Sequence, residues 1–531
     1  MAAERVSWQE ADHPTASRRF ARNAGWTVLG FVVSLASGLV LSPFIVRTLG
    51  AERYGIWALV FALIEYVWLC DLGLRSAVLK FSAQYQAQQD ADRVNQVVNT
   101  ALVYFSIVAA AVSLALAAAF SSLPALFAIS AESREEFSFL VLALGASWSL
   151  GLVSNVFRAS LEGFQRYELL SRITILGTGI RVTGCFAALL MGAGMRGMGI
   201  AVVTAQVTMY LLTFLAFRRS FGAFRCSYRH VSADVLLAMA RYGAYTTVST
   251  VATLLLNQGP VLLIGRLLSA LYVGLYSVPV RLLATMTDAV AQVAMVTVAS
   301  SADLSARGEV GAVGRLTVVV NRYCLALFLP VSILLWVYGP EIFRLWVGPE
   351  VATGSAPLLP ILVVGASFGL AGQQNSNAAL FGLGKHRGFA FGLMVEGLLC
   401  VAGMGYVLPR YGLLTGVAVS TVLLLVNRGI WVPWLVCRYT GVPFLDYMRE
   451  IYLWPTITAA PILLAASLLK LAGVQGTSWP EIALAAALVG VTYYGLAMLL
   501  CLQPDHRASL RSWIGRRKLR RSPAAALAPG K

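Results

Sequence analysis

The stretch RTLGAERYGIW (residues 47–57) recurs in altered form further along the chain as RLLSALYVGLY (266–276). Four identities lie at matching positions, pairing Arg47 with Arg266, Leu49 with Leu268, Ala51 with Ala270 and Gly55 with Gly274. The offset that relates these pairs also places LEGFQR (161–166) on LFGLGK (380–385). Because one offset is kept across more than a hundred residues, we predict an internal repeat.

Long apolar runs surround these copies. The 531-residue chain is 58% hydrophobic and 12% charged, which is more apolar surface than a soluble domain can bury. Runs of about 20 apolar residues recur, the length at which a helix crosses a ~30 Å hydrocarbon layer. They predict fourteen spans, at residues 24–46, 54–79, 97–120, 137–160, 169–191, 198–217, 242–265, 271–299, 317–339, 357–381, 389–408, 412–437, 451–471 and 481–502.

The repeat and the spans together predict the fold class. Each copy contains six spans, and an even number points both halves the same way through the membrane. We therefore predict an all-α polytopic membrane protein with two six-helix lobes related by a parallel repeat, followed by two C-terminal helices. The predicted parts are an N-terminal tail (1–22), an N-lobe (23–220), a basic inter-lobe loop (221–241), a C-lobe (242–440), the last two spans (441–502) and a basic tail (503–531).

Positive charge indicates the orientation. With the N-terminus inside, and with residues near the end of a span counted in the adjoining loop, 29 of the 41 lysines and arginines fall on the cytoplasmic side, 8 fall on the other side and 4 lie deep within spans. This excess predicts that both termini are cytoplasmic. The net charge of +17 then reflects membrane topology and contact with anionic lipid. Nucleic-acid binding is not expected, because no aromatic interleaving or folded module accompanies the basic tail.

Three segments resemble a known family. RNAGW (22–26), RTLGAERYGIWAL (47–59) and DLGLRSAVLKFSAQY (71–85) are similar to the N-terminal pattern of bacterial polysaccharide-biosynthesis membrane proteins. These are the Wzx-type O-antigen flippases of the multidrug/oligosaccharidyl-lipid/polysaccharide flippase superfamily. The LxGxxK/R stretches after spans four and ten fit the same pattern, and the resemblance covers the chain from about residue 18 to 440.

The resemblance implies a two-lobed transporter in the bacterial cytoplasmic (inner) membrane. It implies a flippase that carries an undecaprenyl-pyrophosphate-linked glycan from the cytoplasmic to the outer leaflet, by alternating access of the lobes. The product would serve lipopolysaccharide O-antigen or exopolysaccharide synthesis. Membrane lipids and polysaccharide polymerase or export machinery are the further partners.

Other functions remain open. A lipid II flippase would use similar physics, and a multidrug or cation antiporter would share the fold but prefer acids and aromatic residues in its cavity. A membrane glycan polymerase or ligase is disfavoured, because the outward loops are short and all four histidines fall on the cytoplasmic side. We therefore expect no enzyme. Seven scattered cysteines without a C-x-x-C pair indicate no disulfide framework, and no metal or cofactor is expected.

Arginines within the spans are the first candidate substrate contacts, since a charge at mid-membrane costs roughly 2.5–3.5 kcal/mol on insertion scales. Arginine binds phosphate oxygens bidentately and keeps its proton, which suits a pyrophosphate. Arg281 in span eight is the leading candidate, with balance by Asp288 as its alternative. Arg181 in span five is a second candidate. Arg181 and Arg428 in span twelve could each instead pair with an acid. Arg75 is a third, unless it extends to the lipid headgroups.

Acidic and amide side chains complete the candidate site. Asp71 lies four residues before Arg75 on one helical face, so an intrahelical pair is predicted. Glu65 and Glu396 are each expected to neutralise an arginine or to bind a coupling proton or sodium ion. In the polar run GQQNSNAAL of span ten, the amides are expected to bond sugar hydroxyls or neighbouring helices. These amide candidates are Gln373, Gln374 and Asn377.

Helix breakers lie at nearly corresponding places in the first helix of each half. Pro43 interrupts the predicted helix of the first half, and Gly259-Pro260 interrupts that of the second. Paired breakers of this kind are typical of a binding site or hinge between lobes. Pro43 and Pro260 are therefore the predicted hinge residues, with a packing kink as the alternative.

Overall fold

The computed structural model describes residues 16–295, 297–503 and 506–507. Within these residues the regular secondary structure is helical, with no strand. Twelve segments of this part are long and apolar enough to cross a membrane. Two of them, Leu29–Asp71 and Arg387–Thr440, contain a turn and hold two predicted spans each. All fourteen predicted spans therefore coincide with helices, and the predicted fold class is confirmed.

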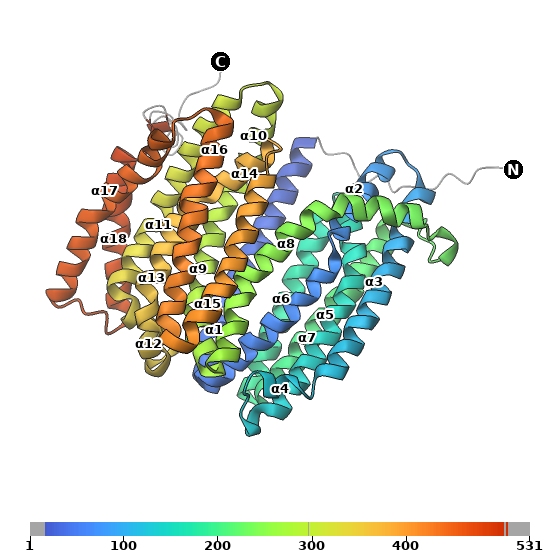
Figure 1. Cartoon of the computed structure of the whole chain (residues 1–531), viewed down its shortest axis with the longest axis horizontal. Helices are drawn as coiled ribbons and strands as arrows, with labels where there is room; N and C mark the ends of the chain where they lie inside the picture. Colours follow the sequence, from blue (N-terminus) through green and yellow to red (C-terminus); the bar gives the residue numbers. More distant parts are fainter. Residues whose placement is uncertain (1–15, 296, 504–505, 508–531) are drawn as a thin grey trace, which may run out of the picture. The chain divides into compact units, whose positions relative to one another are not determined.

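Long helices alternate with short irregular segments (Figure 1). The α-helices are α1 (Ala16–Glu65), α2 (Leu74–Ala87), α3 (Ala91–Ala119), α4 (Leu123–Leu126), α5 (Arg134–Gly163), α6 (Tyr167–Leu190), α7 (Gly194–Ser220), α8 (Ala233–Leu267), α9 (Ala270–Met295), α10 (Thr297–Ala306), α11 (Val310–Val347), α12 (Pro349–Ser355), α13 (Leu359–Val364), α14 (Gln374–Gly382), α15 (Arg387–Val426), α16 (Val432–Thr440), α17 (Phe444–Leu471) and α18 (Trp479–Leu500). The 3-10 segments are η1 (Tyr66–Asp71), η2 (Ala131–Ser133), η3 (Tyr228–His230), η4 (Ala356–Leu358) and η6 (Ala371–Gln373), and the π-helical segments are η5 (Gly365–Leu370) and η7 (Asn427–Trp431).

Two long helices are hairpins folded at a glycine. Gly50 in α1 has φ 83° and ψ 170°, and Gly412 in α15 has φ 78° and ψ −174°, a backbone conformation that glycine adopts without a Cβ clash. In α15 the reversal brings Val419 Cγ1 to 3.0 Å from the position that a Cβ on Gly403 would take. A straight helix would separate these two residues by about 24 Å.

The predicted repeat is present in the packing of both halves. In the first half, a Cβ on Gly163 would lie 2.8 Å from the Leu79 carbonyl oxygen and 3.3 Å from Ser82 Cβ. In the second half, a Cβ on Gly382 would lie 2.8 Å from Ser301 Cβ. The offset of the sequence repeat relates both the two glycines and the two serines, so α2 packs on α5 as α10 packs on α14.

A second contact joins the two copies of the stretch that reveals the repeat. A Cβ on Gly55 would lie 1.8 Å from the Ala270 carbonyl oxygen, and a Cβ on Gly274 would lie 2.1 Å from the Ala51 carbonyl oxygen. The contact is reciprocal, because each Ala-x-x-x-Gly segment presents its glycine to the alanine of the other. Reciprocity of this kind is what a local twofold relation produces. Small residues four apart let membrane helices approach this closely.

The chain forms two compact units. Unit 1 comprises the chain up to Leu282 together with Trp346–Ser355 and Leu393–Ser420, and unit 2 comprises Leu283–Leu345, Ala356–Gly392 and the chain from Thr421 onward. Helix α8, the first half of α9 and most of the α15 hairpin therefore group with the N-terminal helices. The units thus differ from the predicted lobes, whose boundaries stay a prediction.

Each unit has its own apolar core. In unit 1, α2, α3, α5 and α7 pack around the buried rings of Phe105 and Phe217. In unit 2, helices that include α11, α17 and α18 enclose Tyr338, Tyr447 and Tyr493, which are fully buried. The last two predicted spans, α17 and α18, lie side by side (Figure 1) and belong to this second core.

Neither proline expected to interrupt a helix does so. Pro43 lies inside α1 and Pro260 inside α8, and the breaks come later, at Gly50 and at Leu268. Unpaired backbone groups are costly in a bilayer, and neighbouring helices and side chains can satisfy those that a proline releases, so a membrane helix continues past it. A hinge role for Pro43 and Pro260 stays a prediction.

Candidate functional site

Charged side chains gather at one depth in unit 1. Glu65 on α1 and Arg281 on α9 lie roughly three to four helical turns after a chain reversal, and Arg181 on α6 lies about three turns before one. The three reversals are at Gly50, Gly192 and Leu268. At about 5.4 Å per turn these separations are roughly 17–22 Å along the helix, which is well inside a ~30 Å hydrocarbon layer.

Glu65 and Arg281 contact neighbouring helices. The Glu65 carboxylate accepts a hydrogen bond from Gln258 Nε2 on α8. Arg281 lies within electrostatic range of Glu65, and its Nη2 is 3.9 Å from the position that a Cβ on Gly38 of α1 would take. The guanidinium therefore reaches from α9 to the first membrane segment, while the Arg281 side chain keeps an exposed surface.

Arg181 adds a second cation to this group. Its side chain is half-buried, and its Nε is buried without a hydrogen-bond partner among the described residues. Arg281 lies within electrostatic range of Arg181 and repels it. Leaving a buried donor unsatisfied costs about 1–3 kcal/mol, and more for a charged group. Two guanidiniums beside one carboxylate are net positive, so the cluster suits an anion with several acceptor oxygens, such as a phosphate.

The remaining charged candidates are Asp288, Glu396 and Arg428. Asp288 is exposed on α9, two turns beyond Arg281, and their pairing stays a prediction. Glu396 on α15 is buried, with 4% of its surface exposed. Arg428 is half-buried in the π-helical segment η7. Coupling or counter-ion roles for these residues likewise stay predictions.

The predicted pair of Asp71 with the Arg75 guanidinium is wrong. The chain leaves η1 through Leu72 and Gly73, both with left-handed φ, so Asp71 precedes α2 instead of lying on its face. Its Oδ1 accepts the Arg75 backbone N–H at 3.2 Å, which satisfies an orphan donor at the start of the helix. The Arg75 guanidinium donates to both oxygens of Glu162 on α5, at 2.8 and 2.6 Å.

The polar run of span ten lies on a broken helix. The π-helical η5 is followed by the 3-10 segment η6 before α14 begins, so the regular backbone bonding is interrupted. Side chains of α11 and α17 supply the missing partners. Asn321 Oδ1 accepts the Asn375 backbone N–H at 2.7 Å, and the Tyr452 hydroxyl donates to the Phe368 carbonyl at 2.8 Å. Backbone groups at membrane depth require such partners.

A buried network of side chains extends from these contacts. Asn321 Nδ2 donates to the hydroxyls of Ser376 and Tyr447 at 2.9 and 3.0 Å. The Gln373 oxygen accepts from the same two hydroxyls, at 2.7 and 3.1 Å, while its Nε2 donates to Tyr452 at 2.8 Å. The Gln373 amide is therefore engaged at both ends by neighbouring helices of unit 2.

The two remaining amide candidates are more accessible. Gln374 is half-buried and Asn377 is exposed, both on α14. Contact between these amides and sugar hydroxyls stays a prediction.

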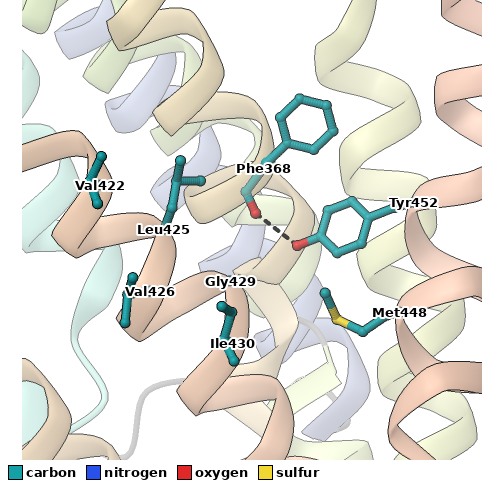
Figure 2. Close-up of a pocket in the computed structure, with 8 residues that line it drawn as sticks. All are labelled: Phe368, Val422, Leu425, Val426, Gly429, Ile430, Met448 and Tyr452. Atoms are coloured by element: carbon teal, nitrogen blue, oxygen red, sulfur yellow. Dashed lines mark hydrogen bonds between the residues drawn. The ribbon is translucent and has the colours of Figure 1, made fainter. Parts of the chain in front are cut away.

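An apolar groove of about 350 Å³ adjoins the network in unit 2. It is lined by Phe368, Val422, Leu425, Val426, Gly429, Ile430, Met448 and Tyr452 (Figure 2). Figure 2 shows the Tyr452 hydroxyl bonded to the Phe368 carbonyl oxygen, so this polar atom is satisfied by the protein itself. Such a lining suits a hydrocarbon chain and offers few partners to phosphate or sugar.

The sequence did not predict which side chains form hydrogen bonds with the candidate site residues. Gln258, Asn321 and Tyr447 each lie directly beside another polar residue, and the sequence does not reveal which distant side chain each one meets. Arg158 and Glu162 did carry a signal, since they lie four residues apart at the end of span four. Among the described residues no cluster of histidine, cysteine, aspartate and glutamate could hold a metal ion.

Known proteins resemble this chain in sequence and fold. A family model described as polysaccharide biosynthesis protein matches residues 20–299, more than half of the chain. A Shigella flexneri protein named "Putative O-antigen transporter" is 21% identical over 429 residues, which cover 79% of this chain and 98% of that protein. The lipid II flippase MurJ, in an inward closed conformation, superposes with a TM-score of 0.71 at 10% identity, covering 90% of this chain and 98% of its own. An inward-facing multidrug resistance MATE transporter gives 0.65 at 15% identity, covering 78% and 96%.

Proposed function

Since the chain belongs to the polysaccharide biosynthesis protein family, we propose that it flips a polyprenyl-pyrophosphate-linked oligosaccharide across the bacterial inner membrane. Transport runs from the cytoplasmic to the outer leaflet, by alternating access of the two lobes. The fold of the multidrug/oligosaccharidyl-lipid/polysaccharide flippase superfamily supports this proposal, as does the name of the Shigella relative.

The observation that carries the proposal is the net positive cluster of Arg181, Arg281 and Glu65 at mid-depth of unit 1. A lipid-linked oligosaccharide has a hydrocarbon tail that can stay in lipid. Its pyrophosphate carries about two negative charges and must cross the layer in which an unpaired charge is most costly. Two guanidiniums at that depth supply charge-assisted hydrogen bonds to the phosphate oxygens.

The direction of transport follows from the proposed orientation. Both termini lie in the cytoplasm on the distribution of lysine and arginine, so the substrate is loaded where glycan precursors are assembled. A polysaccharide polymerase or export complex is then the partner that takes the product from the outer leaflet.

Two functions of the same fold compete with this proposal. A cation antiporter needs a net negative site, whereas the mid-depth cluster holds two arginines and one glutamate. A lipid II flippase needs the same pyrophosphate site, so the cluster does not separate the two substrates. Genetic complementation separates them, because only a lipid II flippase supports growth of a strain depleted of its own.

The test is export in a strain that lacks this protein. We expect lipid-linked glycans to accumulate in the inner leaflet and the wild-type chain to restore their export. Arg281→Ala should slow export at least about tenfold, the loss expected when a charge-assisted hydrogen bond of about 1.5–3 kcal/mol is removed. Arg281→Lys should restore only part of the rate, because lysine keeps the charge but loses the bidentate geometry.

Matched variants separate anion binding from internal charge balance. Arg410→Ala removes an exposed guanidinium that contacts the Tyr406 carbonyl, and it should leave export unchanged. If Arg281 mainly balances Asp288, the double variant Arg281→Ala with Asp288→Ala should export normally. Normal export by that double variant rejects the phosphate role of Arg281, and growth of a lipid II flippase-depleted strain on this chain rejects the proposed substrate.

A further inference from the structure

Two arginines share one carboxylate at the end of span four. Glu162 lies in the last turn of α5 and accepts from Arg158 Nε, one turn earlier, at 3.2 Å. It also accepts from Arg75 of α2 at 2.8 and 2.6 Å. The side chains of Arg158 and Arg75 are 41% and 39% exposed, whereas Glu162 is 10% exposed. The acid is therefore covered by the two cations, and the Asp71 carboxylate also lies within electrostatic range of Arg75.

The backbone around this group is closely packed. Gly163 follows Glu162, and a Cβ there would lie 2.8 Å from the Leu79 carbonyl oxygen, so α2 and α5 are almost in contact. Ser82 and Ser160 hydrogen-bond across the same interface at 3.4 Å. This packing holds the starts of both arginine side chains at a fixed separation before any ligand binds.

Among the residues that the structure describes, the hydrogen bonds of this group leave most of its guanidinium donors available. Each guanidinium carries five N–H donors, and the contacts with Glu162 use only Nη2 of Arg75 and Nε of Arg158. An anion with several acceptor oxygens can therefore be held by both arginines at once, as bidentate arginine–phosphate geometry requires.

The other half of the repeat has the same framework without these charges. Gly382 packs on Ser301 as Gly163 packs on Ser82. At the repeat offset, however, Arg75, Arg158 and Glu162 correspond to Ala294, Asn377 and Phe381. The packing of the two helices therefore does not need the three charged residues. Their presence in one half alone indicates a function other than folding.

We propose that Arg75 and Arg158 bind a phosphate or pyrophosphate group, and that the Glu162 carboxylate occupies the position of this group when no ligand is bound. In the absence of ligand, Glu162 keeps the two guanidiniums directed toward each other. A phosphate that binds accepts hydrogen bonds from the free guanidinium donors and weakens the bonds to Glu162. Under the proposed orientation this group lies at the cytoplasmic end of the spans, so it would meet the substrate before the mid-depth arginines do. That placement rests on the proposed function, whereas anion binding itself does not.

Binding of defined probes to the purified full chain tests the proposal. We expect inorganic pyrophosphate and farnesyl pyrophosphate to bind in neutral detergent. Arg158→Gln and Arg75→Gln should each weaken both affinities by roughly tenfold or more, the loss expected for one charge-assisted contact. Glu162→Gln should tighten them by about three- to tenfold, because it removes the competing acceptor but keeps the side-chain shape.

The control is Arg93→Gln, which removes an exposed arginine near Asp90 and should not change either affinity. Unchanged binding in Arg158→Gln, or equal or weaker binding in Glu162→Gln, would overturn the site. Monodisperse protein with an unchanged unfolding midpoint shows that each variant folds, and Arg158→Lys, which retains the charge, should recover part of the affinity.

Lipid competition identifies the source of the anion. If nanodiscs of phosphatidylglycerol abolish farnesyl pyrophosphate binding, the site is upheld as a phosphate site and its ligand is a phospholipid headgroup. If they do not, the site is selective for the pyrophosphate of a lipid-linked substrate. Failure of the export experiment with intact pyrophosphate binding would reject the proposed function and leave this site standing.

Discussion

The reciprocal crossing of Gly55 with Ala270 and of Gly274 with Ala51 makes a quantitative prediction. In Gly55→Ala the new methyl group would start 1.8 Å from a carbonyl oxygen, whereas ordinary contact begins at 3.4 Å. The two helices must therefore separate by about 1.6 Å, since the obstructing atom is backbone and cannot rotate away. Gly274→Ala starts from 2.1 Å and needs about 1.3 Å.

Both methyl groups act on the same crossing, so their effects should not add. Overpacking of this kind costs about 1–3 kcal/mol in each single variant. Once the helices have separated for the first methyl group, the space for the second is largely present. The double variant should therefore lose about as much stability as Gly55→Ala alone, giving a coupling energy of roughly 1–3 kcal/mol.

The assay is unfolding in mixed micelles, with the free energy of unfolding measured by detergent titration, alongside export of lipid-linked glycan. Gly179→Ala is the matched control, because it lies on α6 with no atom within 4 Å of the new Cβ. It should be neutral or stabilising by up to about 1 kcal/mol, as expected for glycine to alanine within a helix. Wild-type stability in Gly55→Ala, or additive losses in the double variant, would refute the reciprocal crossing.

Two further predictions concern the network of unit 2 and the topology. Asn321→Leu should lower the free energy of unfolding by roughly 2–4 kcal/mol, because it leaves the Asn375 amide and two hydroxyls without this partner. Tyr452→Phe, measured in the same titration, should lose less, since it removes one hydroxyl; equal losses would contradict the central place of Asn321. A reporter that works only in the cytoplasm should be active when fused after Leu502, and activity of an exported reporter at that site would reverse the assigned orientation.

The sequence determined the membrane class, the spans and the repeat of this protein. Apolar runs of the length of a bilayer are a local property, so the fourteen spans could be predicted without knowing any contact. The common offset of the two copies was likewise visible, because the close approaches at Gly55 and Gly163 require small residues at equivalent places in both copies.

Only the tertiary structure decided which charges and amides meet. Sequence spacing favoured Asp71 as the partner of the Arg75 guanidinium, but the break at Leu72 removes Asp71 from the helical face, and Glu162 takes its place from 87 residues away. In the same way, the sequence left open whether the Gln373 amide bonds sugar hydroxyls or neighbouring helices, and the structure bonds it to Tyr447 and Tyr452. The physical reason is that a polar group in a membrane must form a hydrogen bond or ion pair with some partner. The apolar runs between such groups do not indicate which helices pack together, so the partner cannot be predicted from the sequence.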